Sequence, residues 1–286
     1  HSLGGFLATG LALEFPQHVE HAYLYNTPGL GGLTSRPVLD EIARVYHITG
    51  GSFDPSRFSN VRAKPGTSLI SGFGTPLAAP ILVEGEDHGG LLIGTANHSI
   101  KHLVDSLAIH DAFSRLGNGA DESLASIGRI VRGSSDRELG KLEGALDALR
   151  KTVTGGTISS TPEENREALY ENLYALTGSS AYANLASRAT LTPIASLGRE
   201  EIATTASGSL GSLVALRWLA SFRLGGVDAQ LAAVHPELDA SLRHDAALPA
   251  SRRDIDAFYS DAWRHERARM LGHVVSHNES DSVADR

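Results

Sequence analysis

A turn of small residues opens the chain and leads directly into a helix. Ser2-Leu3-Gly4-Gly5 begins an apolar segment with leucines again at Leu7 and Leu11, and Pro16 ends it. Residues 19–26 then predict a strand, which gives way to Thr-Pro-Gly. Turn, helix and strand in this order predict part of a layered α/β unit.

The turn also has the residue pattern of a serine nucleophile. In the motif G-x-S-x-G, small residues flank the serine because the turn from strand to helix is tight. Ser2-Leu3-Gly4 supplies the second half, and the first Gly would precede His1. The pattern also fits a Gly-rich loop, but the helix and strand that follow favour a nucleophile turn. We therefore predict Ser2 as nucleophile and the Leu3 N–H as one oxyanion contact, with Gly5 allowing close helix packing.

A histidine late in the unit is the expected general base. His98 follows the last strand-like run and precedes a helix at residues 100–108, whose apolar residues recur with helical spacing. His88 is the competitor, although its loop is rich in glycine. A His that only caps the helix start is the alternative for His98.

The acid that would orient His98 is less clear in the sequence. No Asp or Glu lies between Pro55 and Val83, where a carboxylate is expected after the strand at residues 58–63. Asp87 follows the next strand, at residues 80–83, and precedes His98, so chain order favours it. Glu84 and Glu86 are close alternatives, and a Ser-His dyad without an acid stays open. Asp54 precedes its strand and is expected at the wrong end of the sheet.

A metal site is a weaker hypothesis. His98 and His102 are spaced to share a helix face, but Ser99 stands where a zinc hydrolase of the H-E-x-x-H type needs Glu. We therefore expect no metal and no cofactor.

Composition excludes several other classes of function. The net charge is −8 and basic residues form no long run, which argues against nucleic acid as a partner. Cysteine is absent, so thiol nucleophiles and disulfides are excluded. No apolar run approaches the roughly 20 residues of a membrane span.

The chain changes texture near Gly117. We predict one domain over residues 1–117 and a second, mainly helical region with a linker over residues 118–286. Helices are expected at 38–46, 139–153, 162–176, 210–222 and 255–275, and the acidic end, residues 278–286, is expected as a linker. The Arg-rich stretch at residues 263–269 is interpreted as a solvated helix face.

Two segments together resemble a known family. His-Ser-Leu-Gly-Gly, followed by Ala-Tyr-Leu-Tyr-Asn-Thr-Pro-Gly, is similar to the lipase-type α/β-hydrolases, with their GHSLGG turn and a strand of the form YTFNAPG. Asn97-His98-Ser99-Ile100, Asp105-Ser106-Leu107-Ala108 and the segments at residues 258–263 and 266–271 resemble a lipase-like region of large bacterial secreted proteins with calcium-binding repeats.

The resemblance implies a fold and an activity. It implies the C-terminal half of an α/β-hydrolase sheet, an N-terminally truncated fragment that is inactive alone, and a parent that is secreted or at the cell surface. Calcium-binding repeats are expected elsewhere in the parent. The implied activity is that of a serine lipase or esterase, and lipid, phospholipid, polyester and small ester substrates stay open. The alternative is a scaffold or adhesion module that has lost catalysis.

Overall fold

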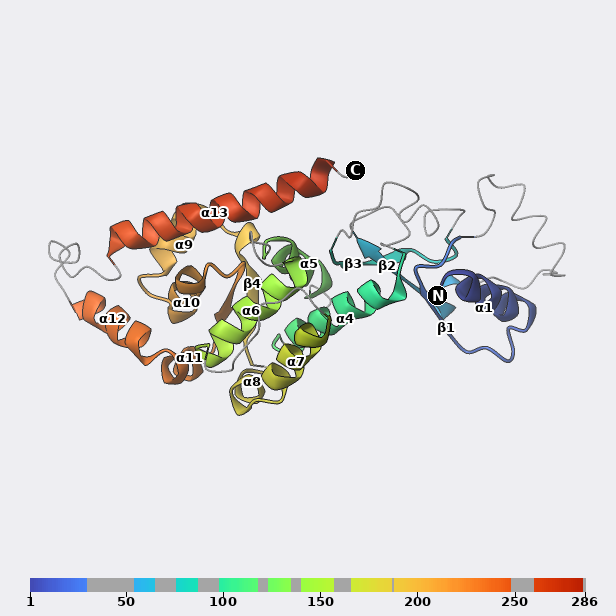
Figure 1. Cartoon of the computed structure of the whole chain (residues 1–286), viewed down its shortest axis with the longest axis horizontal. Helices are drawn as coiled ribbons and strands as arrows, with labels where there is room; N and C mark the ends of the chain where they lie inside the picture. The colour runs from blue at the N-terminus through green and yellow to red at the C-terminus, as the bar shows by residue number, and fades with distance from the viewer. Residues whose placement is uncertain are drawn as a thin grey trace. The chain divides into compact units, whose positions relative to one another are not determined.

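The chain forms an α/β structure with two compact units, residues 1–106 and 107–286, as a computed structural model shows (Figure 1). The structure describes residues 1–29, 54–64, 76–86, 98–117, 123–134, 140–156, 166–186, 188–247 and 260–284. The division between the units falls inside helix α4 (Ile100–Ser114). The domain boundary near Gly117 stays a prediction.

The first unit contains a parallel three-stranded sheet. Its strands are β1 (Ala22–Tyr25), β2 (Phe58–Lys64) and β3 (Pro80–Glu84), in the order β1-β2-β3. The register places Tyr25 beside Val61 and Val61 beside Ile81. The strands predicted at residues 19–26, 58–63 and 80–83 are confirmed with small changes at their ends. Because all three run in the same direction, their carboxyl ends meet at one edge of the sheet.

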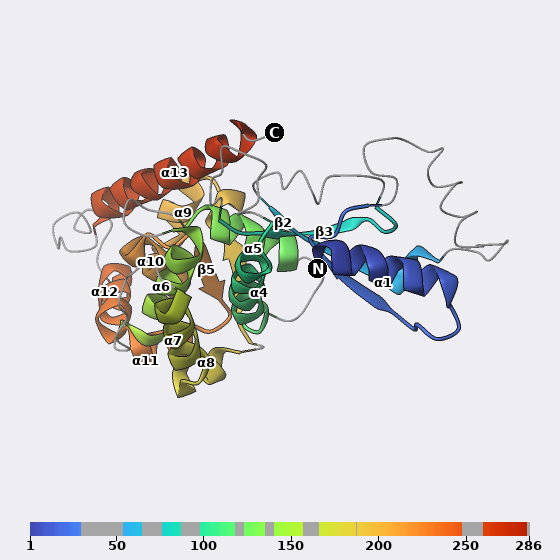
Figure 2. The same cartoon turned by 45° about the vertical axis from the view of Figure 1, so that its right-hand side comes forward.

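Helix α1 (Ser2–Glu14) confirms the first predicted helix and lies alongside β1 (Figure 1), and Figure 2 shows the same helix in a second view. Its buried face carries small residues, Gly5, Thr9, Gly10 and Ala12. The side of the helix that carries the leucines is exposed: Leu3, Leu7 and Leu11 are 66%, 61% and 53% exposed. Small residues thus allow the helix to approach the sheet closely.

Helix α4 is longer than its apolar spacing predicts. Leu103 is fully buried, but Ile100 and Val104, members of the same predicted stripe, are 37% and 40% exposed. The buried face instead includes the polar residues Ser106 and His110. The apolar pattern misplaced this face because it takes no account of buried polar side chains.

The second unit is mostly helical. In the described part of the chain its elements are α5 (Ser123–Arg132), α6 (Lys141–Thr154), α7 (Arg166–Thr177), α8 (Ser180–Leu185), β4 (Thr190–Pro193), η2 (Ile194–Ser196), α9 (Arg199–Thr205), α10 (Leu210–Trp218), β5 (Phe222–Gly225), α11 (Asp228–Val234), α12 (Pro236–Ala247) and α13 (Asp261–Ala284). Strands β4 and β5 form an antiparallel pair that the sequence did not predict. The helices predicted at 139–153, 162–176 and 255–275 correspond to α6, α7 and α13.

Two predicted boundaries in this unit are wrong. The helix expected over residues 210–222 ends at Trp218, where Leu219 adopts a left-handed φ of 50°, and Phe222 begins β5. The linker expected after residue 278 is helical, since α13 continues to Ala284. No Pro or Gly follows Gly272, so no strong breaker opposes propagation of the helix.

The Arg-rich face of α13 is not wholly solvated, which corrects the sequence interpretation. Arg264 is 2% exposed and forms a 2.7 Å ion pair with Asp245 of α12. It also bonds Asp261, one turn earlier on its own helix. Arg267 donates from Nε to the carbonyl oxygen of Leu216 at the end of α10. These contacts join α13 to neighbouring helices. The predicted helix at 38–46 and the first residues, 162–165, of the helix predicted at 162–176 lie outside the described residues.

Candidate active site

Ser2 occupies a sharp backbone turn at the start of α1. Its φ is 51°, in the left-handed region that non-glycine residues rarely adopt. Such conformations cost about 1–3 kcal/mol and cluster at functional sites, where the surrounding structure holds them in place. The turn places Ser2 at the first residue of α1.

The side chain of Ser2 meets His98. The distance from Ser2 Oγ to His98 Nε2 is 2.8 Å, although 96 residues separate the two in the chain. His98 is 8% exposed and lies just before α4. The contact predicted between these side chains is therefore present, at the distance a nucleophile and its base require.

A second Ser-His pair shows that distance alone does not define the site. His21 Nε2 lies 2.9 Å from Ser59 Oγ. Ser59 follows Phe58, the first residue of β2, so this pair lies toward the amino ends of the strands. Ser59 has neither a positive φ nor a place at a helix start. The Ser2 pair alone combines the bond with the strained turn among the described residues.

The surroundings of His98 favour its neutral form. Burial lowers the pKa of His98 below its ordinary value of 6.5. A neutral imidazole is the form that can accept a proton from serine. When His98 Nε2 accepts from Ser2, the proton of the ring resides on Nδ1.

Two further side chains contact the main chain of His98. The carbonyl oxygen of His98 accepts from His1 Nε2 at 2.7 Å and from Asn26 Nδ2 at 3.5 Å. The rings of His1 and His98 also lie in contact, with centroids 4.8 Å apart. Sequence reasoning missed both residues. Their only signals were positional, since His1 adjoins Ser2 and Asn26 ends the first strand.

Asn26 is fixed firmly at the carboxyl end of β1. It is 1% exposed and has a left-handed φ of 45°. Its backbone N–H donates to Val61 O at 2.9 Å, and its Oδ1 accepts from Ala63 N at 3.0 Å. Because Asn26 reaches His98, the candidate site lies at the carboxyl edge of the parallel sheet, where α/β proteins bind ligands.

The glycines after Ser2 have different roles. A Cβ on Gly5 would lie 2.0 Å from Thr27 Oγ1, so the close helix packing expected there is confirmed. A Cβ on Gly4 would meet no atom within 4 Å outside its own stretch of helix. No described atom would clash with a side chain at position 4, so the prediction that the tight turn requires a small residue there is wrong for the described residues. Leu3 lies in the first turn of α1, where the N–H groups have no partner within the helix.

The candidate acids fall in different places. Asp87, the first choice from the sequence, lies outside the described residues, as does the competing base His88. Glu84 is the last residue of β3 and is 4% exposed, while Glu86 is half-buried beyond it. Asp54 accepts from Ser56 N at 2.9 Å and caps η1 (Pro55–Arg57), directly before β2. It therefore lies at the amino end of the sheet, away from His98.

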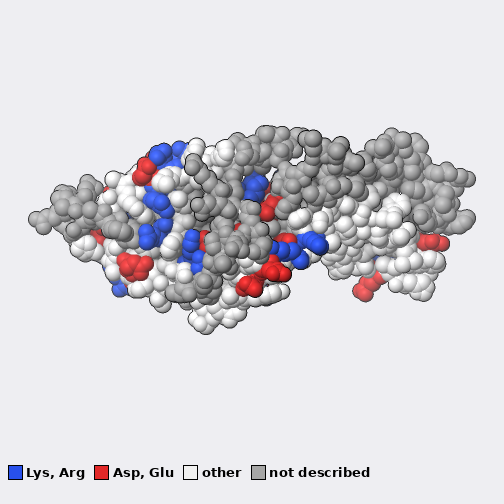
Figure 3. Space-filling view, in the orientation of Figure 1, with Lys and Arg blue, Asp and Glu red and all other residues white. Residues whose placement is uncertain are grey.

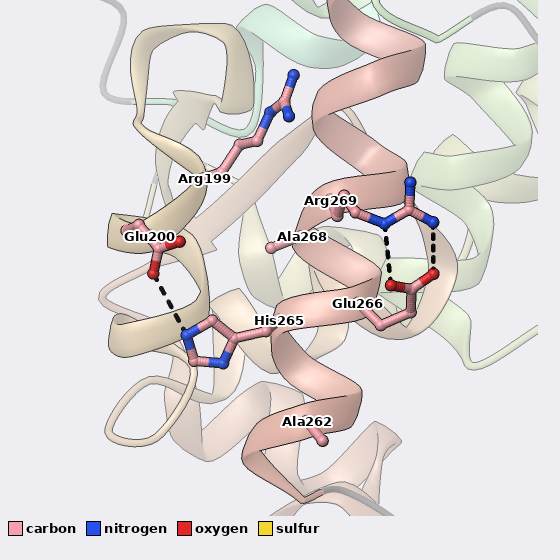
Figure 4. Close-up of a pocket in the computed structure, with 7 residues that line it drawn as sticks. All are labelled: Arg199, Glu200, Ala262, His265, Glu266, Ala268 and Arg269. Carbon is pink, nitrogen blue, oxygen red and sulfur yellow. Dashed lines mark hydrogen bonds and ion pairs between the residues drawn. The ribbon is translucent and has the colours of Figure 1, made fainter.

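A crevice of about 340 Å³ lies between α9 and α13 in the second unit (Figure 4). His265 Nε2 lies 3.3 Å from Glu200 Oε2, and Arg269 donates two hydrogen bonds to the Glu266 carboxylate. Figure 4 shows that these two pairs point to different sides of α13, so their charges do not converge on one point. The Ser2–His98 pair thus remains the better candidate for chemistry.

The described residues contain no cluster of three or more His, Cys, Asp or Glu arranged to hold a metal ion. None of the helices in the described part of the chain combines the length and apolar character that crossing a bilayer requires.

Comparison of the chain with protein-family models, with curated proteins and with solved structures finds no match.

Proposed function

We propose that this chain carries the nucleophile and the general base of a serine ester hydrolase of the lipase-type α/β-hydrolase family. The observation that carries the proposal is the 2.8 Å contact between Ser2 Oγ and His98 Nε2 at a serine whose φ is 51°. Its position at the carboxyl edge of a parallel sheet and the start of α1 supports the same assignment.

The reaction would proceed through an acyl-enzyme. Ser2 Oγ attacks the ester carbonyl carbon while His98 Nε2 takes the serine proton. The negative oxygen of the tetrahedral intermediate faces the Leu3 N–H at the start of α1, where the helix dipole favours negative charge. The ester C–O bond then breaks, and His98 gives the proton to the leaving alcohol. Water, activated by His98, hydrolyses the acyl-enzyme and restores Ser2.

A carboxylate at His98 Nδ1 would fix the tautomer that this reaction needs. Asp87 stays the first candidate from chain order, and Glu84 and Glu86 stay the alternatives. Asp54 is not proposed, because it caps η1 at the other end of β2.

The test is covalent labelling of the protein with a fluorophosphonate, followed by peptide mass spectrometry. We expect the label on Ser2. Ser2→Ala should abolish it and lower ester hydrolysis by more than about a thousandfold, since loss of a triad serine costs about a millionfold elsewhere. Ser59→Ala is the matched control, because it removes the second Ser-His contact seen among the described residues of this unit, and it should leave labelling unchanged.

Two outcomes would contradict the proposal. Folded protein that takes no label at Ser2 would favour the alternative of a scaffold or adhesion module. Hydrolysis that persists in Ser2→Ala would show that another residue is the nucleophile.

A further inference from the structure

We propose that His1 and Asn26 are positioning residues that hold the imidazole of His98 against Ser2. The inference rests on the proposed function for its catalytic meaning, but it concerns contacts that can be measured without activity. Both side chains act on the same atom, the main-chain carbonyl oxygen of His98.

His98 lies in a turn just before the first residue of α4, outside the strands of the described sheet. Its carbonyl oxygen accepts hydrogen bonds from the side chains of two other segments. A carbonyl oxygen only accepts, so His1 must carry a proton on Nε2 to make its 2.7 Å bond. The contact between the two rings restricts the same segment from the side.

Asn26 supplies the second anchor from the sheet. Its backbone N–H and its Oδ1 are both bonded to β2, at Val61 and Ala63, so the side chain has little freedom. Its Nδ2 then reaches the His98 carbonyl oxygen at 3.5 Å, a longer and weaker bond than that of His1. Strand β2, Asn26 and His98 thus form a continuous chain of hydrogen bonds.

The geometry links nucleophile and base through one short segment. His1 immediately precedes Ser2, so the residue that bonds the His98 carbonyl is covalently joined to the residue that meets the His98 ring. A displacement of the His98 turn would therefore break two contacts to adjacent residues. We infer that His1 and Asn26 define where Nε2 points.

Two substitutions of His1 separate hydrogen bonding from ring contact. His1→Phe keeps an aromatic ring but removes the donor, whereas His1→Gln keeps an N–H donor near the position of Nε2. Because His1 is exposed, neither change disturbs a core. Asn26→Asp tests the second anchor, since it keeps the acceptor for Ala63 and removes the donor to His98. Asp also tolerates the left-handed backbone.

The readout is the nitrogen-15 shift of His98 Nε2 by NMR, with the signal assigned by its loss in His98→Gln. In each background we compare the shift with and without Ser2→Ala. We expect Ser2→Ala to move the His98 signal in the wild type and in His1→Gln, and to move it far less in His1→Phe and Asn26→Asp. The signal of His21, which bonds Ser59, should stay constant as a measure of the fold.

Labelling of Ser2 gives a second and independent readout. His1→Phe should slow fluorophosphonate labelling about three- to tenfold, as expected for loss of one hydrogen bond, and His1→Gln should restore most of the rate. If Ser2→Ala moves the His98 signal equally in all backgrounds, the positioning role is wrong even where Ser2 is labelled. If the shifts behave as expected but Ser2 takes no label, the positioning role stands and the proposed function is wrong. A His21 signal that moves in Asn26→Asp would reject that variant, and the decision would then rest on the His1 pair.

Discussion

The two units differ in the size of their described apolar cores and in where their charged residues lie. The second unit has an extensive core that links its helices and its two-stranded sheet, with Phe113 and Phe222 in edge-to-face contact. The described core of the first unit is small, formed by Ala12, Ala22, Leu24 and Phe58 with a few partly buried neighbours. On the face in Figure 3, Lys and Arg alternate with Asp and Glu over the second unit, whereas α1 contains one charged residue, Glu14.

The two units also differ in where their described non-glycine residues with positive φ lie. Among the described residues, three non-glycine residues have a positive φ, and two of them, Ser2 and Asn26, belong to the first unit and contact His98. The third, Leu219, ends α10 in the second unit. Positive-φ residues therefore gather at the candidate site in the described part of the first unit and mark a helix end in the second.

The largest expected effect on stability concerns Arg264 in the second unit. Arg264→Met removes a buried partner of Asp245 and should lower the free energy of unfolding by about 3–5 kcal/mol. Arg269→Met on the same helix breaks an exposed ion pair and should cost less than about 1 kcal/mol. Denaturant titration monitored by tryptophan fluorescence measures both, because Trp218 and Trp263 lie in this unit. Equal losses would show that burial does not distinguish the two pairs.

A smaller effect is expected at the glycines of the first unit. Gly5→Ala places a methyl group against Thr27 and should destabilise the contact of α1 with β1 by about 1–3 kcal/mol. Gly4→Ala should be neutral or stabilising, because no described atom outside its own stretch of helix lies within 4 Å of a Cβ at this position and alanine favours a helix. Hydrogen exchange of the β1 and β2 amides gives the measurement. Thr27→Ala should rescue Gly5→Ala, and failure to do so would contradict the steric explanation.

The smallest effect is a pH dependence in the second unit. His235 is 1% exposed, and burial lowers its pKa below 6.5, although its bond to Thr152 O and nearby Glu237 oppose this shift. The unfolded state therefore binds a proton at a higher pH than the folded state does. Stability should be full above the ordinary His pKa and should decline as the pH falls below 6.5 toward the folded pKa. Tryptophan-monitored unfolding between about pH 5 and 8 tests this, and His235→Gln should flatten the decline.

Local patterns predicted much of the first unit. The small residues around Ser2, the aromatic and apolar strand after them and the helix after His98 each leave a signal within a few residues. Those signals were enough to predict the three strands and the Ser2–His98 contact. The anchors of His98, which are His1 and Asn26, were missed because many side chains with an N–H or O–H group can donate to a main-chain carbonyl. Such a contact therefore leaves no characteristic residue pattern in the sequence. Only the folded structure brings His1 and Asn26 to that atom.

The second unit was harder to predict for other physical reasons. Strand β4 has four residues and ends in Pro193, so it lacks the length and the alternation that mark a strand. Helix α10 ends at a leucine in the left-handed region, where the sequence offers no glycine as a stop signal. Arg264 lies in a run of charges that is indistinguishable from a solvated face, because its buried partner Asp245 comes from another helix.

The most direct test of the central claim is the pH dependence of Ser2 labelling in the wild type and in His98→Gln. If His98 is the base, the labelling rate in the wild type rises with pH through one pKa below 6.5 and then stays level, because only neutral His98 accepts the serine proton. His98→Gln should lose both the plateau and most of the rate. Labelling of His98→Gln at the wild-type rate, with the wild-type pH profile, would contradict the account.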